Sequence, residues 1–186
     1  MEYTLSQIFV VLSYIFLAMT YLTKKRQIIL FYSIVAVVFN GFSYFFLKAW
    51  SGLAAIIVAL IRNAIFVVQE KFDKSEGYKY WDYLILAFLL ILNTIFAIIT
   101  YDGFLSLFTA FASVTYTVSI WQKNTKAYKL LGILSSAFNI VYLVFIWSIF
   151  GFILESALFI ITIVGTVLYF MQNKIAKEKE NSDGIS

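Results

Sequence analysis

The sequence predicts an all-α integral membrane protein with seven transmembrane helices. Hydrophobic residues make up 62% of the 186 residues and charged residues 13%, whereas a soluble domain carries about half and about a quarter. The apolar residues also gather in seven runs, each close to the ~20 residues that cross the hydrocarbon core of a bilayer as a helix. Similarity between the first three runs and the last three indicates two parallel repeats around a linker helix, a 3+1+3 plan.

The seven runs follow one another with very short connections, so consecutive helices should be antiparallel neighbours. They cover 5–22, 28–47, 51–70, 81–100, 104–121, 128–147 and 150–172. The first run has no basic stretch before it and no A-x-A cleavage site, so we expect a retained helix rather than a signal peptide. Residues 1–172 then form one membrane domain, and residues 173–186 form a polar cytoplasmic tail.

The basic residues are distributed unevenly between the two ends of the predicted helices. Twelve fall on one side, whereas only Lys48 falls on the other. The twelve are Lys24, Lys25, Arg26, Lys71, Lys74, Lys79, Lys123, Lys126, Lys129, Lys174, Lys177 and Lys179. Because Lys and Arg are enriched in cytoplasmic loops, this asymmetry predicts the N-terminus outside and the C-terminus inside. Trp50, Trp81, Trp121 and Trp147 lie near span ends, as an interfacial aromatic belt predicts.

A shift of 99 residues aligns the two ends of the chain. The string AVVFNGFSYFF at 36–46 then meets SSAFNIVYLVF at 135–145. Residues 5–70 and 104–172 are therefore predicted to be two copies of one three-helix unit. Three crossings reverse the direction of the chain, so the run at 81–100 is needed as a linker that lets both copies point the same way. Parallel repeats of this kind are one architecture of membrane transporters.

Arg62 and Glu155 lie inside predicted spans, where a charged group costs roughly 2.5–3.5 kcal/mol at the helix centre and faces protein or water. Their backbones differ in depth by roughly 9 Å, at a rise of about 1.5 Å per residue, and the long arginine side chain can close much of that gap. We expect the two charges to compensate each other, directly or through a water molecule. The pair then either locks two helices together or takes part in binding a solute or carrying protons; alternatively, one of them snorkels to an interface.

Asn40 and Asn139 occupy equivalent depths in the two repeats. Two amides facing each other across a pseudo-twofold axis offer donors and acceptors to a polar solute. The simpler alternative is hydrogen bonding between helices, worth roughly 0.6 kcal/mol on average. Asn63, next to the arginine, and Tyr142, on the polar face of the sixth run, complete the candidate substrate-binding set. Asn93, in the linker run, is interpreted as a helix contact.

Several functions are excluded by residues that the chain lacks. It contains no cysteine and no histidine, which removes disulfides, thiol chemistry and imidazole metal sites. A single deep carboxylate is a poor catalytic set, so we expect no enzyme, no metal and no cofactor. The loops are too short to build a nucleic-acid-binding face. The expected partners are the lipid bilayer and an unknown small polar solute.

The strings FYSIVAVVFNGFSYFFLKAWSGLAAIIVALIRNAIF at 31–66 and ILESALFIITIVGTVLYFM at 153–171 resemble the YgjV family of small bacterial inner-membrane proteins. Members of that family have an arginine in the third span and a glutamate in the last, which are Arg62 and Glu155 here. The resemblance covers nearly the whole chain and implies a multi-pass protein of the bacterial inner membrane. It brings no established activity with it.

The 3+1+3 plan is also similar to that of the PQ-loop and SWEET-like transporters and of the PnuC-like nicotinamide riboside transporters. The chain departs from both patterns, because it has no proline for a SWEET-type hinge and no evident paired tryptophan motif. By analogy with SWEET-like relatives, a homo-oligomer is also expected. The leading hypothesis is a small-solute transporter or facilitator with a central polar site between the two repeats. The alternative is a non-transporting membrane scaffold or regulatory subunit.

Overall fold

The computed structural model describes residues 2–48, 50–72, 80–101, 103–145, 147 and 149–183, with side chains undescribed at 50–52, 54, 55, 72 and 176–183. Five of the residues on which the predicted orientation and aromatic belt depend lie outside these residues or side chains. The residues concerned are Trp50, Lys74, Lys79, Lys177 and Lys179.

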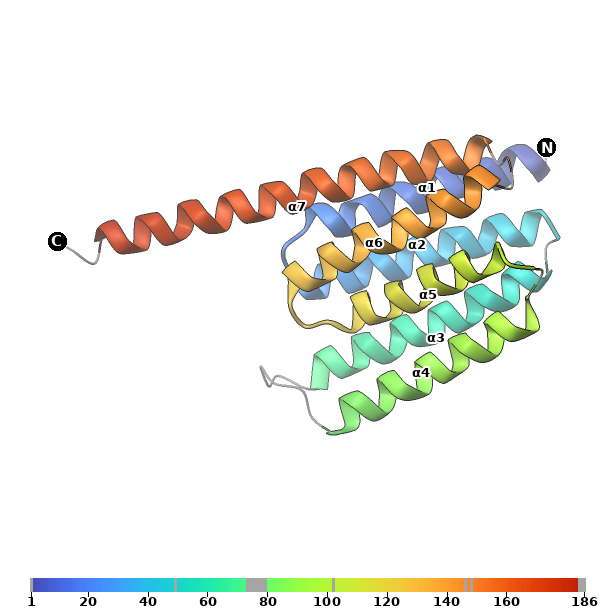
Figure 1. Cartoon of the computed structure of the whole chain (residues 1–186), viewed down its shortest axis with the longest axis horizontal. Helices are drawn as coiled ribbons and strands as arrows, with labels where there is room; N and C mark the ends of the chain where they lie inside the picture. The colour runs from blue at the N-terminus through green and yellow to red at the C-terminus, as the bar shows by residue number, and fades with distance from the viewer. Residues whose placement is uncertain are drawn as a thin grey trace.

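The described chain is folded into seven α-helices and contains no strand. The helices are α1 (Glu2–Leu22), α2 (Arg26–Phe46), α3 (Trp50–Phe72), α4 (Tyr80–Ile99), α5 (Ser106–Trp121), α6 (Thr125–Phe145) and α7 (Ile149–Asp183). Their bounds lie within three residues of the predicted runs, except that α7 continues past residue 172 into the polar tail. Helices α1, α3, α5 and α7 run in one direction, and α2, α4 and α6 run in the other (Figure 1).

Within the part of the chain that the structure describes, five helices are long and apolar enough to cross a membrane: α1, α2, α4, α6 and the segment Ile149–Ile175 of α7. Helix α5 has 16 residues, which corresponds to a length of about 24 Å. Helix α3 includes side chains that lie outside the described ones. Membrane crossing by α3 and α5 therefore stays a prediction from the sequence.

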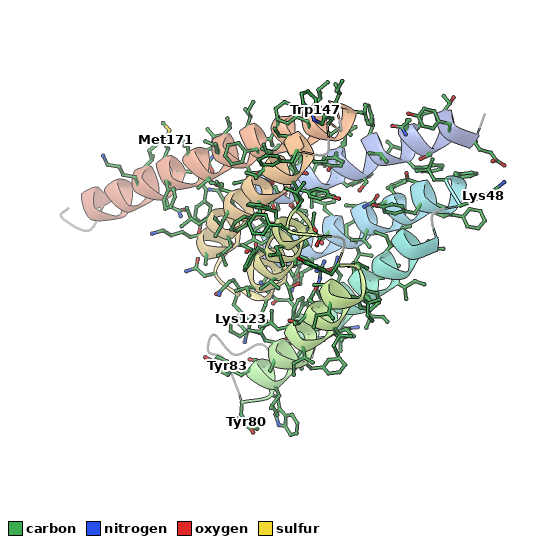
Figure 2. The ribbon with its side chains drawn as sticks, turned by 45° about the vertical axis from the view of Figure 1, so that its right-hand side comes forward. Lys48, Tyr80, Tyr83, Lys123, Trp147 and Met171 are labelled. Carbon is green, nitrogen blue, oxygen red and sulfur yellow. The ribbon has the colours of Figure 1, made fainter. Side chains whose placement is uncertain are left out.

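The outer surface of the bundle is rich in exposed apolar side chains. Trp147 is 87% exposed, Tyr80 73% and Met171 55%, and all three point away from the helices (Figure 2). In a membrane such a surface faces the lipid chains. Trp121 behaves differently, because it is only 7% exposed and belongs to the buried core. The prediction that Trp121 is part of an interfacial belt is therefore wrong.

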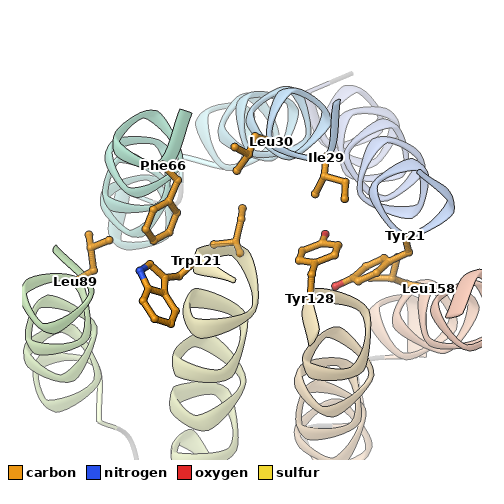
Figure 3. Close-up of a cluster of buried hydrophobic side chains, with 9 residues drawn as sticks. Tyr21, Ile29, Leu30, Phe66, Leu89, Trp121, Tyr128 and Leu158 are labelled. Atoms are coloured by element: carbon orange, nitrogen blue, oxygen red, sulfur yellow. The ribbon is translucent and has the colours of Figure 1, made fainter. Parts of the chain in front are cut away.

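The helices pack as a ring (Figure 3). Helix α2 lies between α1 and α3, and α6 lies between α5 and α7. Contacts between α1 and α7 and between α3 and α5 close the ring, while α4 packs on the outside of α5.

Helix bounds and turn conformations recur at an offset of 99 residues. Both ends of α2 (Arg26–Phe46) and α6 (Thr125–Phe145) differ by this number, and so do the starts of α3 and α7. Lys48 and Trp147 are also 99 residues apart, and they are the non-glycine residues of the described chain with a positive φ, 55° in each. A positive φ is uncommon for a residue with a side chain. The same unusual turn conformation therefore follows α2 and α6.

A cluster of buried apolar side chains joins the helices near the basic connections. Its members are Tyr21, Ile29, Leu30, Phe66, Leu89, Ile120, Trp121, Tyr128 and Leu158 (Figure 3). The rings of Tyr21 and Tyr128 are stacked with their centroids 5.3 Å apart. The backbone of Tyr21 also lies close to α7, because a Cβ atom added at Gly165 would be 2.5 Å from the carbonyl oxygen of Tyr21. An added Cβ at Gly132 would overlap the Tyr21 ring.

The C-terminal end of α5 is held by Arg26 from α2. The Nη2 atom of Arg26 lies 3.2 Å from the carbonyl oxygen of Ile120 and 3.3 Å from that of Trp121, and Nη1 donates to the carbonyl of Gln122. Its Nε atom pairs with Glu70 of α3 at 2.7 Å. Arg26 thus provides donors for carbonyl groups that a helix end leaves unsatisfied.

The C-terminal end of α1 is held from α6 by two residues. Lys129 is 1% exposed, and its ammonium group donates to the carbonyls of Tyr21 and Gly165. Thr125 Oγ1 donates to the carbonyl of Lys24, just beyond α1, at 3.1 Å. The second helix of each group of three therefore binds the end of the first helix of the other group.

Candidate functional site

A cavity of about 410 Å³ lies inside the ring of helices. Every helix except α4 contributes to its lining. Four of the six predicted site residues line it: Asn40, Arg62, Asn139 and Glu155. The remaining two, Asn63 and Tyr142, are not among its lining residues.

The lining of this central cavity follows the 99-residue offset. Sixteen of its twenty lining residues form eight pairs at this separation. The pairs are Ser13 and Ala112, Tyr14 and Ser113, Leu17 and Tyr116, Ala36 and Ser135, Val37 and Ser136, Asn40 and Asn139, Ile56 and Glu155, and Ala59 and Leu158. Both groups of three helices therefore present equivalent positions to the same space.

Arg62 reaches the cavity from the middle of α3 and is 6% exposed. Its Nη1 atom donates to Thr117 Oγ1 at 3.0 Å, and its Nε atom lies 3.3 Å from Asn63 Oδ1. The guanidinium carbon also lies 5.0 Å from the centroid of the Tyr116 ring, within the range of a cation–π contact. All three partners are uncharged, and two of them belong to α5.

Asn63 is fully buried, and it supports Arg62 rather than facing the cavity. Its amide nitrogen donates to Ser33 Oγ at 2.9 Å, and the Ser33 hydroxyl lies 3.0 Å from the Tyr116 hydroxyl. A closed network thus connects α2, α3 and α5 around the arginine. A buried network in which each polar group has a partner fixes side-chain orientation.

Glu155 lies on the α7 side of the cavity and is 3% exposed. The Tyr14 hydroxyl donates to Glu155 Oε2 at 2.9 Å, and Asn139 Nδ2 lies 3.4 Å from Oε1. These partners come from α1 and α6 and are neutral. Asn139 therefore forms a hydrogen bond between helices, the simpler alternative, and it also lines the cavity.

Arg62 and Glu155 were expected to pair directly or through a water molecule, and the direct contact is not formed. Among the described residues no ion pair joins them, and each has the neutral partners given above. The reason is the direction of the side chains around the helix axes. A difference in depth along the axis, estimated from the sequence, carries no information about this direction. The two charges instead face the same cavity from opposite groups of helices.

A smaller cavity of about 250 Å³ lies between α3, α4 and α5, and Arg62 lines this cavity as well. Asn93 of α4 also lines it, and its Nδ2 atom lies 3.1 Å from Thr117 Oγ1. The Ser113 hydroxyl donates to Asn93 Oδ1 at 2.7 Å. Asn93 is therefore a helix contact between α4 and α5, as predicted.

The partners of the two charged residues were missed in the sequence. Thr117 and Tyr116 bind the arginine, and Tyr14 binds the glutamate. Tyr14 had an available signal, because the offset that aligns Asn40 with Asn139 also aligns Tyr14 with Ser113. Tyr14 and Ser113 therefore take equivalent places in the lining of the cavity.

Comparisons with known proteins agree with the apolar bundle. A family model described as a bacterial inner membrane protein, Imp-YgjV, matches residues 4–174. No curated protein and no solved structure matches the chain. Since the match extends over most of the chain, including all four cavity-lining residues predicted from the sequence, the protein belongs to the YgjV family and is located in the bacterial inner membrane.

Proposed function

We propose that the protein carries a small polar solute across the inner membrane and binds it in the central cavity. The observation that carries this proposal is the composition of the cavity. It contains an arginine, a glutamate and two asparagines inside an apolar bundle, and polar residues at such depth are characteristic of solute pathways. A volume of about 410 Å³ lies within the range of ligand sites, roughly 300–1,000 Å³.

We further infer that α1–α3 and α5–α7 are parallel repeats related by a pseudo-twofold axis through the cavity. The offset of 99 residues exchanges α1 with α5, α2 with α6 and α3 with α7. Under this exchange the contact of α1 with α7 becomes the contact of α5 with α3, and both contacts occur. The eight residue pairs around the cavity support the same axis. Parallel repeats with a site at their interface are a known transporter plan.

The proposed orientation puts the N-terminus outside, following the positive-inside rule. Lys24, Lys71 and Lys123 lie at or near the C-terminal ends of α1, α3 and α5. These three helix ends are on the same side of the bundle (Figure 1). The buried cluster around Tyr21 and Tyr128 lies near this end. On this orientation it separates the cavity from the cytoplasm, and rocking of one repeat against the other would expose the cavity to the two sides in turn.

Uptake into proteoliposomes over a panel of small metabolites tests the proposal. At least one solute should enter faster than into protein-free vesicles. Arg62→Met should abolish this uptake, whereas Ile61→Ala, a change at a side chain that is 49% exposed on the same helix, should preserve it. Uptake of every solute at the rate of protein-free vesicles would overturn the proposal. A stoichiometric partner that copurifies would then favour the scaffold alternative.

A further inference from the structure

Arg62 and Glu155 both line the central cavity and form no ion pair with each other. Among the described residues, the partners of each are neutral side chains. No described residue forms an ion pair with either of them. Buried charges are normally paired, because an isolated charge in a low-dielectric interior is strongly destabilising. The site is therefore built around two charges that each lack a charged partner within the described protein.

The two charges lie at different depths and on different sides of the inferred axis. The position equivalent to Glu155 in the first repeat is Ile56, six residues before Arg62 in α3. At ~1.5 Å per residue this corresponds to about 9 Å along the helix axis. The cavity consequently has a positive end near Arg62 and a negative end near Glu155, with Asn40 and Asn139 contributing amide groups to the lining.

We propose that the solute bound in this cavity is a small zwitterion, such as a compact amino acid. Its anionic group lies toward Arg62 and its cationic group toward Glu155, so that one molecule neutralises both charges. A solute with a single charge leaves the opposite protein charge unpaired, and a neutral solute leaves both. This inference rests on the proposed function, because it names the class of solute for the same site.

The test measures binding to the purified wild-type protein in detergent by thermal shift and by calorimetric titration. The probes are straight-chain amino acids from glycine to δ-aminovalerate, in which the distance between amine and carboxylate increases stepwise. Butyrate, butylamine and butyramide serve as matched compounds with one charge or none. The best amino acid should bind at least about tenfold more tightly than any of the three, which is ~1.4 kcal/mol.

Two variants assign the charges to the two ends of the ligand. In Arg62→Met the best amino acid should bind no more tightly than butylamine, and in Glu155→Gln no more tightly than butyrate. Ile61→Ala and Ile153→Ala, with side chains 49% and 58% exposed, are the matched controls and should retain wild-type affinity. If a variant fails to fold, the comparison of the amino acids with butyrate, butylamine and butyramide on the wild-type protein still tests the zwitterion proposal.

The proposal is overturned if butyrate, butylamine or butyramide binds as tightly as the best amino acid, or if no amino acid of the series binds. Uptake assays separate this result from a failure of the proposed function. Transport of a singly charged or neutral solute with no amino acid binding would retain the transporter and remove the zwitterion. Tight amino acid binding without uptake would retain the zwitterion site and remove transport.

Discussion

The first three helices and the last three share a backbone frame but differ in where they place charge. Their bounds recur at a fixed offset, and the turns after α2 and α6 both contain a residue with φ of 55°. The charges around the cavity, however, do not recur. At the offset of 99 residues, Glu155 corresponds to Ile56, and Arg62 corresponds to Ile161. Each group therefore contributes one charge of opposite sign. Two groups of helices with the same backbone arrangement can therefore enclose a cavity whose ionisable side chains are placed asymmetrically.

The same division occurs at the basic end of the bundle. Arg26 of α2 and Lys129 of α6 each bind carbonyl groups at the end of the opposite group's first helix. Arg26 corresponds to Thr125 in the second group, and Lys129 corresponds to Leu30 in the first. The basic residue is therefore placed about one helical turn further along α6 than along α2. The function of binding the helix end is retained, whereas the residue that provides it is not.

Gly165→Ala should cause the largest loss of stability. The added Cβ lies 2.5 Å from the backbone oxygen of Tyr21, so α1 and α7 must separate, and overpacking of this kind costs roughly 1–3 kcal/mol or more. The matched control is Gly41→Ala, whose Cβ would meet a side-chain atom rather than backbone, Ile56 Cγ2 at 3.1 Å. Thermal unfolding in detergent measures both. Equal melting temperatures for the two variants would show that α1 and α7 are not held closely here.

Arg26→Gln should destabilise the protein more than Thr125→Ala, its counterpart in the second group. Arg26 binds three carbonyls and Glu70, and hydrogen bonds of a charged donor are worth about 1.5–3 kcal/mol. Thr125 provides one hydrogen bond, worth roughly 0.5–1.5 kcal/mol. Unfolding in a denaturant series compares the two variants. The reverse order would mean that the end of α1, rather than that of α5, limits stability.

A double-mutant cycle measures how the two cavity charges interact. Arg62→Met combined with Glu155→Gln should give the smaller coupling energy of two cycles, because no direct contact joins these side chains. Tyr14→Phe combined with Glu155→Gln should give more, within roughly 0.5–3 kcal/mol, because the hydroxyl donates to the carboxylate at 2.9 Å. A larger coupling for the arginine cycle would restore the ion pair expected from the sequence.

The two asparagines should show the smallest difference in stability. Asn139→Ala removes a hydrogen bond to Glu155, and hydrogen bonds between membrane helices are worth roughly 0.6 kcal/mol on average. Asn40→Ala should change stability by less, and both variants should weaken solute binding because both residues line the cavity. Melting temperatures together with ligand titrations separate the two effects. Unchanged ligand affinity in both variants would remove the asparagines from the site.

The sequence predicted the helices well and the contacts between them poorly. Helix bounds follow from the lengths of apolar runs, and the shared cavity of Asn40 and Asn139 follows from their equivalent positions. Arg62 and Glu155 were expected to pair directly or through a water molecule, and the direct form does not occur because rotation about a helix axis is set by packing. The burial of Trp121 was missed for the same reason. The end of α7 at Asp183 was missed because a polar stretch can remain helical beyond the apolar run.

The close approach of Tyr21 to Gly132 and Gly165 limits how the bundle can move. With the ring against one glycine and the carbonyl oxygen against the other, α1 cannot slide along α6 and α7 by the height of a residue without a steric clash. Tyr21 therefore holds α1 in register with α6 and α7.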